Sequence, residues 1–225
     1  MSQVNFGALS PYIPQLLAGL GLTILISAAA VAISLPLGMG GALLRTSRYR
    51  VLRTIMAAYV QVVRNVPIVL ILFLIFFELA NAGFPLPPAM AAVAALSING
   101  SAYATEIFRG GLAGIPPGQY EAAYSLGFRP VQVFRYVVLP QLMLISFPAL
   151  GNQVVGTVLA SSVVFFIGVE ELSSASNQIG SKTFRYFEVF MIAGLMYVIA
   201  AQAINFTWVR VGRRWTVTES ARKAA

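Results

Sequence analysis

The stretch "EAAYSLGFRPVQVFRYVVLP", residues 121–140, is a polar and basic segment set between long runs that contain no charged residue. The uncharged runs cover residues 16–44, 79–105, 136–169 and 189–209. Each run is long enough to hold the roughly 20 apolar residues of a membrane-spanning helix. The quoted segment is therefore typical of a loop that lies at a membrane surface between two spans.

Composition supports a membrane protein. Of the 225 residues, 58% are hydrophobic and 10% are charged, which exceeds the apolar content of an ordinary soluble domain. A further apolar run covers residues 55–77 but contains Arg64. The 13 residues between Arg64 and Glu78 would extend about 20 Å, less than the ~30 Å hydrocarbon core. We expect one or both of these charges to face protein or water, or to reach the membrane surface.

These patterns predict an all-α integral membrane protein with a single domain, residues 1–225. The five spans are expected near residues 14–44, 55–80, 87–108, 141–167 and 187–210, with a loop at residues 109–140. Because the first apolar run follows no basic region and no evident cleavage site, the first span is expected to be retained.

Two residue types are missing from the chain. Cysteine and histidine are absent, which excludes thiolate metal sites and disulfides and removes the commonest general base. We therefore expect no catalytic residues and no metal site, and a membrane-embedded hydrolase is disfavoured.

Basic residues are distributed unevenly. Twelve of the 15 basic residues fall in segments on one predicted side of the membrane, namely Arg45, Arg48, Arg50, Arg53, Arg109, Arg129, Arg135, Arg210, Arg213, Arg214, Arg222 and Lys223. The loops on the other side contain only Lys182 and Arg185, and Arg64 lies near a span end. The positive-inside rule places these twelve in the cytoplasm, with the N-terminus outside and the C-terminus inside. Five spans satisfy this arrangement, whereas four or six do not. The net charge of +8 thus indicates topology, and nucleic-acid binding is not expected.

The polar loop predicts two short helices. Pro116 and Pro117 favour a helix start and Gly127 favours a left-handed C-cap, which gives a helix over residues 118–126. Pro130 begins a second helix that we expect to end before Pro140. Helices this short are marginal alone, so another structure is expected to pack on them.

One face of the first helix is suited to close contact. Tyr120, Ala123, Tyr124 and Gly127 follow the i, i+3, i+4, i+7 pattern, and the small side chains would let another backbone approach. Glu121 lies near the helix start and could receive an arginine from a partner. The alternative is an amphipathic loop that lies on the membrane surface.

The loop also carries a family resemblance. Its spacing resembles the EAA motif of ATP-binding-cassette (ABC) importer permeases, with valine where isoleucine is usual: Glu121, Ala122, Ala123, three residues, Gly127, nine residues, Val137, one residue, Leu139 and Pro140. The segments "AYVQVVRNVPIVLILFLIFF", "LGNQV" and "KTFRYFEVFMIAGLMYVI" are similar to polar amino acid permeases of the histidine/glutamine type. The resemblance covers nearly the whole chain.

This resemblance implies a type I ABC importer permease fold in a bacterial inner membrane, and an amino acid importer that works by alternating access. The implied partners are a second permease subunit, identical or paralogous, an extracytoplasmic solute-binding protein and a cytoplasmic ATPase dimer that holds ATP and Mg. The implied ATPase contacts are Tyr120, Glu121, Ala122, Ala123, Gly127, Leu139 and Pro140. The chain has no G-x-x-x-x-G-K-[ST] sequence, so no cofactor is expected on it.

Two polar stripes could line a substrate path. Ser97, Ser101 and Thr105 recur every four residues in the third span, and so do Gln153, Thr157 and Ser161 in the fourth. Polar groups at membrane depth usually face the bundle interior. The alternative is that these hydroxyls bond their own helix or hold neighbouring helices together.

Charges near the span ends allow further predictions. Glu106 and Arg109 are spaced for an i, i+3 ion pair. Glu78, Glu170 and Glu171 end spans on the outer side, and we count Glu78 among the candidate pathway residues. These carboxylates predict that a cationic or zwitterionic amino acid is accepted better than an acidic one.

Two other functions remain open. A secondary transporter or channel without an ATPase would need a charged relay along its path and would leave the EAA loop unexplained. A membrane-anchored scaffold would leave the polar stripes unexplained. The discriminating observation is whether a nucleotide-binding protein copurifies with the chain.

Overall fold

The computed structural model describes residues 6–224, with the side chains of residues 6–212. Within this range the chain is helical and contains no strand. The α-helices are α1 (Ile13–Arg45), α2 (Arg50–Asn65), α3 (Ile68–Phe73), α4 (Leu79–Asn81), α5 (Pro88–Ala113), α6 (Pro117–Ser125), α7 (Pro130–Val133), α8 (Leu139–Ala160), α9 (Leu172–Thr183) and α10 (Tyr186–Ala224). Phe6–Tyr12 and Ser161–Ile167 are 3₁₀ helices, and Leu74–Glu78 and Phe134–Val138 are π-helical turns.

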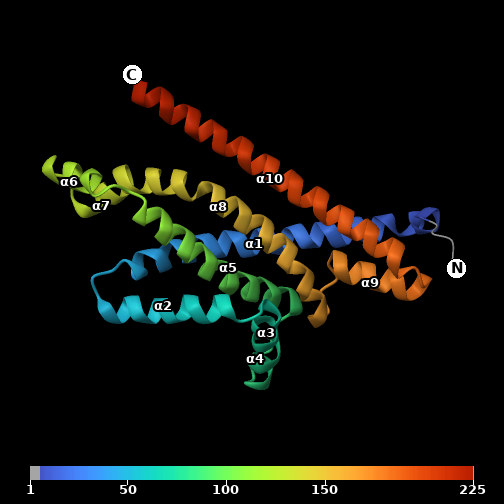
Figure 1. The fold of residues 1–225 in the computed structure, drawn as a ribbon. Helices are drawn as coiled ribbons and strands as arrows, with labels where there is room; N and C mark the ends of the chain where they lie inside the picture. Colours follow the sequence, from blue (N-terminus) through green and yellow to red (C-terminus); the bar gives the residue numbers. More distant parts are fainter. Residues whose placement is uncertain (1–5, 225) are drawn as a thin grey trace.

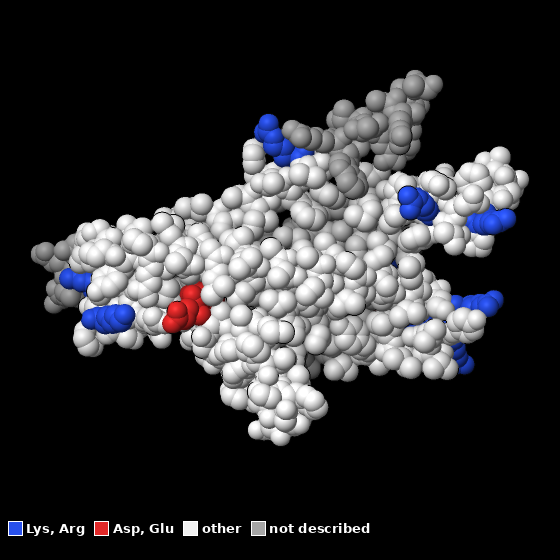
Figure 2. All heavy atoms as spheres, turned by 180° about the vertical axis from the view of Figure 1, so that it is seen from behind, with Lys and Arg blue, Asp and Glu red and all other residues white. Residues whose placement is uncertain are grey.

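The long helices run side by side, with α6 and α7 at one end of the bundle and α9 at the other (Figure 1). The first residues of α1 lie at the α9 end, and the last turns of α10 point toward the α6 end. Most basic side chains on the face shown in Figure 2 lie toward the two ends, one lies between them, and a broad part of this face is uncharged. The orientation of the termini stays a prediction, and the side chains of Arg213, Arg214, Arg222 and Lys223, on which it partly depends, lie outside the described range.

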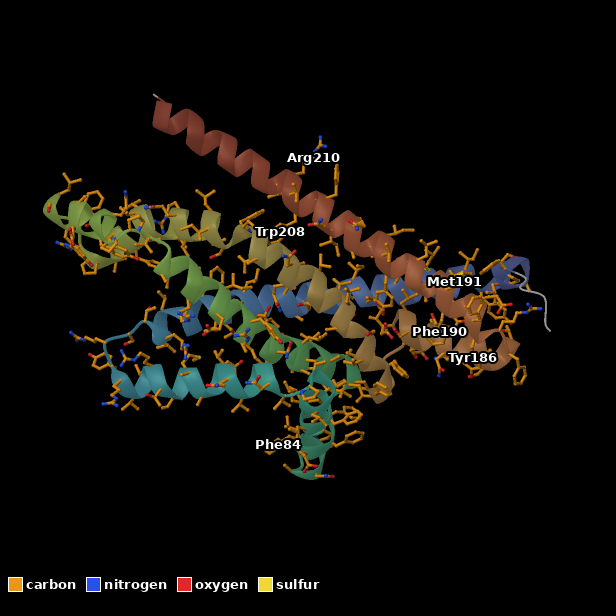
Figure 3. All side chains as sticks on the ribbon, in the orientation of Figure 1. Phe84, Tyr186, Phe190, Met191, Trp208 and Arg210 are labelled. Carbon is orange, nitrogen blue, oxygen red and sulfur yellow. The ribbon has the colours of Figure 1, made fainter. Side chains whose placement is uncertain are left out.

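α1 and α5 form the central helix pair. A Cβ atom added at Gly38 would collide with Ala104, and one added at Gly41 would collide with Thr105. Small residues at these positions let the two backbones approach closely, which is how helices commonly pack in membranes. α10 is held to α8 by Trp208, whose indole N–H donates to the carbonyl of Phe147 at 2.9 Å (Figure 3).

Not every predicted span is an uninterrupted apolar helix. Within the described residues, three helices are long and apolar enough to cross a membrane, namely Phe6–Arg45, Pro130–Ile167 and Tyr186–Gly212. The bent pair Arg50–Asn65 and Ile68–Asn81 would make a fourth. α5 lies among the others with many small and polar residues buried. The count of five spans therefore stays a prediction.

The second predicted span, residues 55–80, is divided into two helical segments, and the direction of the chain changes by 107° between them. The break falls at Val66, which is extended (φ −94°, ψ 130°) because the following Pro67 disfavours helical backbone at the preceding residue. The part after the bend projects from the bundle and leads to Phe84, which is labelled in Figure 3 and 71% exposed.

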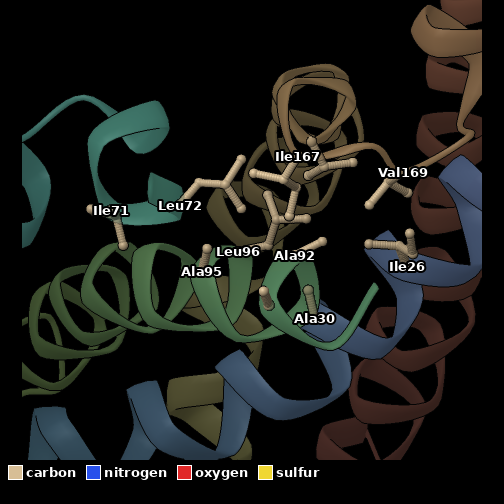
Figure 4. Close-up of a cluster of buried hydrophobic side chains, with 11 residues drawn as sticks. Ile26, Ala30, Ile71, Leu72, Ala92, Ala95, Leu96, Ile167 and Val169 are labelled. Carbon is tan, nitrogen blue, oxygen red and sulfur yellow. The ribbon is translucent and has the colours of Figure 1, made fainter. Parts of the chain in front are cut away.

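The base of this projection is anchored in the core. Ile71 and Leu72 of α3 pack with Ala95 and Leu96 of α5 and with Ile167 (Figure 4). The bend is thus held on one side by buried apolar contacts.

The polar loop forms two connected helices. α6 begins at Pro117, and Gly127 adopts φ +79° after the helix end, as predicted. The N–H groups of Gly127 and Phe128 donate to the carbonyls of Tyr124 (2.9 Å) and Ala123 (3.1 Å), which completes a Schellman motif.

The expected end of the second short helix at Leu139 is wrong. The chain runs from α7 through the π-helical turn directly into α8. The N–H of Leu139 bonds the carbonyl of Phe134, five residues back, and Pro140 lies in the first turn of α8, where its missing N–H is tolerated. The second loop helix is therefore a rigid extension of the following span.

Candidate functional site

The predicted coupling residues lie together at one end of the bundle. Ala123 is buried in a hydrophobic cluster with Phe108, Val133 and Val138, so this side of α6 packs on the chain's own core. Among the other predicted residues, Glu121, Ala122, Gly127 and Pro140 are exposed, and Tyr120 and Leu139 are half-buried. The structure thus leaves most of the motif accessible on one surface.

The side chain of Gln141 connects this surface to α8. Its Nε2 donates to the carbonyl of Val137 at 2.8 Å and lies 3.5 Å from Oε1 of Gln119 on α6. The first contact supplies a donor to a carbonyl within the π-helical turn. Gln141 therefore contacts both α6 and the π-helical turn from the first turn of α8.

A second feature is a polar cavity that opens on the side of the bundle, where Arg64, Asn65 and Gly156 are exposed. It has a volume of about 540 Å³ and lies between the end of α2, the start of α3, α5 and α8. Its lining residues are Arg64, Asn65, Val66, Pro67, Ile68, Leu96, Asn99, Tyr103, Gln153, Gly156, Thr157 and Ala160. The guanidinium of Arg64 lies 5.0 Å from the ring centre of Tyr103, a cation–π contact.

Arg64 sets the electrostatics of this cavity. It is the one charged residue among the lining residues described, and the other polar groups there are amides, a phenol and a hydroxyl. An arginine offers a planar set of N–H donors that matches a carboxylate. The cavity is therefore suited to a small zwitterion whose carboxylate faces Arg64.

Of the predicted pathway residues, Gln153 and Thr157 line this cavity. The Thr157 hydroxyl donates to the carbonyl of Gln153 at 3.0 Å, whereas the Gln153 side chain remains available. Their role in a substrate path stays a prediction.

The other predicted pathway residues lie elsewhere. Ser97 is buried and donates to the carbonyl of Ala30 at 3.4 Å, and Ser101 lies 2.7 Å from the hydroxyl of Tyr59. Ser161 is buried and donates to the carbonyl of Val158 at 2.7 Å. Glu78 is exposed on the projecting segment. The three serines therefore form hydrogen bonds within this chain, and their role in a substrate path stays a prediction.

Sequence reasoning missed Asn65, Asn99 and Tyr103 as cavity residues. Asn99 and Tyr103 are four residues apart on α5 and so share one face, and this spacing is the signal in the sequence that could have identified them. Arg64 was noted only as a charge that needed a polar environment.

The carboxylates predicted to lie on the outer side are not equivalent. Glu171 is fully buried and caps α9, because it accepts hydrogen bonds from the Ser174 N–H (2.9 Å), the Tyr197 hydroxyl (2.7 Å) and the Thr23 hydroxyl (3.3 Å). It therefore cannot face a substrate. Glu78 and Glu170 remain exposed.

Two groups of ionic contacts hold the ends of the bundle. Glu188 pairs with Arg185 at 3.0 Å. The expected ion pair between Glu106 and Arg109 is present at 2.9 Å, and Arg45 pairs with the same carboxylate at 3.0 Å. Among the residues described, no cluster of histidine, cysteine, aspartate or glutamate could hold a metal ion.

Comparisons with known proteins identify the family of this chain. Residues 34–214 match the model of a family described as the binding-protein-dependent transport system inner membrane component. The chain is 34% identical to the arginine transport system permease protein ArtQ of Bacillus subtilis, covering 94% of this chain and 97% of that protein. It is 31% identical to the glutamine transport system permease protein GlnP of Escherichia coli, covering 96% and 99%.

Solved structures show the same fold. A chain from a crystal structure of an amino acid ABC transporter with histidines matches with a TM-score of 0.86 and 34% identity, covering 94% of this chain and 99% of that chain. The MetNI methionine ABC transporter, at 23% identity and a TM-score of 0.77, shares the fold. The chain therefore belongs to the family of binding-protein-dependent transport system inner membrane components.

Proposed function

We propose that this chain is the transmembrane subunit of an ATP-driven amino acid importer and forms half of its translocation path. The observation that carries the proposal is the polar cavity between α2, α5 and α8. Its volume of about 540 Å³ lies within the range of about 300–1,000 Å³ that ligand pockets occupy. Its lining includes one arginine and five uncharged polar side chains, which the packing of apolar helices alone would not require.

In this proposal Arg64 binds the α-carboxylate, and Asn99, Tyr103 and Gln153 offer hydrogen-bonding groups to the rest of the amino acid. The lining also bears on the alternative of a secondary transporter. Such a protein would need a group that exchanges protons or holds an ion, but arginine keeps its proton at physiological pH. An external energy source fits the cavity better.

The energy source in this proposal is a separate cytoplasmic ATPase dimer that holds ATP and Mg and contacts the exposed residues of α6. A second permease subunit, identical or paralogous, completes the path, and an extracytoplasmic solute-binding protein supplies the amino acid. Because the turn after α7 runs without interruption into α8, movement of the docked loop would reach Gln153 and Thr157 along one helix.

Purification of the chain in mild detergent from its native membrane tests this function. A nucleotide-binding protein is expected to copurify, and its ATPase activity in lipid is expected to rise when an amino acid and the solute-binding protein are added. Substrate uptake that follows an ion gradient without ATP would contradict the proposal.

The membrane topology is tested separately. A reporter that is active only in the cytoplasm, fused after Ala225, is expected to be active because the basic segments favour the inner side. A reporter that is active only outside serves as the control at the same site. Activity of the external reporter would overturn both the topology and the placement of α6 at the ATPase.

A further inference from the structure

We propose that a second cavity, beside the coupling helices, binds the phosphate headgroup of an anionic phospholipid. This inference rests on the proposed function, because that function places α6 and α7 at the inner face of the membrane. The cavity has a volume of about 500 Å³, and its lining residues are Leu43, Arg45, Thr46, Arg109, Leu112, Ala113, Tyr120, Tyr124, Pro130, Val133, Phe134 and Val138.

The charge of this cavity is positive. Arg45 and Arg109 both line it, whereas the carboxylate of Glu106 that they share is not part of the lining. One carboxylate between two guanidinium groups leaves one net positive charge. Both arginines remain partly accessible, with side chains 22% and 40% exposed.

The lining also holds donors that this chain does not use. Arg109 donates to Glu106 through Nε, and within residues 6–212 its two Nη groups have no hydrogen-bond partner. The hydroxyls of Tyr120 and Tyr124 likewise have none there. Burial, together with the nearby Tyr124, raises the pKa of Tyr120, so this phenol keeps its proton and can donate. Donors without a lining carboxylate suit a phosphate, which has only acceptor oxygens.

The apolar surroundings favour a lipid as the source of the phosphate. Leu43 lines the cavity and is 40% exposed, and nearby on α1 Leu44 (37% exposed) and Leu37 (55% exposed) share one apolar face. Acyl chains could lie along this face while the headgroup contacts the arginines. Free phosphate would gain nothing from the apolar surface, whereas basic pockets between helices at the inner leaflet bind anionic headgroups.

The test uses the complete detergent-purified complex, with its ATPase, and measures binding of phosphatidylglycerol and phosphatidylcholine by native mass spectrometry. Arg109→Gln removes one guanidinium but leaves the pair between Arg45 and Glu106 intact. Loss of a charge-assisted hydrogen bond is expected to weaken phosphatidylglycerol binding about tenfold. The matched control Arg53→Gln removes one exposed positive charge outside the cavity and is expected to change binding less than about twofold.

A second variant guards against a folding defect. Tyr124→Phe removes only a hydroxyl from a half-exposed side chain and is expected to weaken phosphatidylglycerol binding about threefold. Phosphatidylcholine is expected to bind weakly to every variant, and inorganic phosphate in large excess is expected not to displace phosphatidylglycerol.

Three outcomes would overturn the inference. Equal losses in Arg53→Gln and Arg109→Gln would indicate general attraction to a basic surface. Displacement by inorganic phosphate would indicate a free-anion site, and lipid binding only after the ATPase is removed would indicate that the ATPase fills the cavity. The lipid measurement does not depend on transport. A negative lipid result therefore does not contradict the importer function, and a failure of ATP-driven uptake does not invalidate the lipid result.

Discussion

Replacement of Gly127 by aspartate is expected to abolish transport while the chain still inserts into the membrane. Gly127 adopts φ +79°, where a side chain costs about 1–2 kcal/mol, and a Cβ there would meet no atom within 4 Å, so the fold has room for the change. In the proposed complex the added charge would lie at the ATPase contact, where a buried unpaired charge costs about 2–5 kcal/mol. The measurements are uptake in membrane vesicles and copurification of the ATPase.

Two further substitutions separate the charge from the backbone strain. Gly127→Asn has nearly the shape of aspartate, lacks the charge and tolerates positive φ, so it is expected to keep most of the uptake. Gly127→Ala adds the strain without the polar side chain. If Gly127→Asp transports and binds the ATPase as the unsubstituted chain does, the loop is not a coupling device. Equal failure of Gly127→Asn would indicate that side-chain size alone blocks docking.

The loop around Gly127 was predictable because its signals are local. Proline at a helix start and glycine after a helix end act through their own backbone, and α6 differs from the prediction by one residue at each end. The error at Pro140 has the same origin. Proline disturbs the interior of a helix but is tolerated in the first turn. Pro140 lies in the first turn of α8, and a π-helical turn, not the end of a helix, precedes it.

The cavity was less predictable because its residues come from distant parts of the chain. Apolar composition gives the length of a segment but reveals neither the bend at Val66 nor the contact between Arg64 of α2 and Tyr103 of α5. In addition, the sequence alone does not show whether a hydroxyl side chain on a helix bonds a neighbouring helix or lines a cavity. Ser97 and Thr157 have the same pattern, yet Ser97 bonds a carbonyl of α1 while Thr157 lines the cavity.

Arg64→Gln is expected to lower amino acid uptake about 10- to 100-fold, with the complex still assembled. The substitution removes the one charge among the described cavity residues and leaves an uncharged polar side chain in its place. A hydrogen bond to a charged group contributes about 1.5–3 kcal/mol, which corresponds to this range. Uptake into proteoliposomes with the solute-binding protein present measures the effect, and copurified ATPase measures assembly.

The choice of substrate shows whether Arg64 acts on the carboxylate. An amino acid amide lacks the negative charge that Arg64 would bind, so the unsubstituted chain is expected to transport the amino acid far better than its amide. Arg64→Gln is expected to lose this preference, because both substrates then meet an uncharged side chain. Arg64→Lys keeps the charge but not the planar contact with Tyr103, and it should fall between the two. Arg50→Gln removes a positive charge at the other end of α2 and is expected to transport normally. If Arg64→Gln keeps the full preference for the amino acid over its amide, the carboxylate is recognised elsewhere, in the partner permease or in the solute-binding protein.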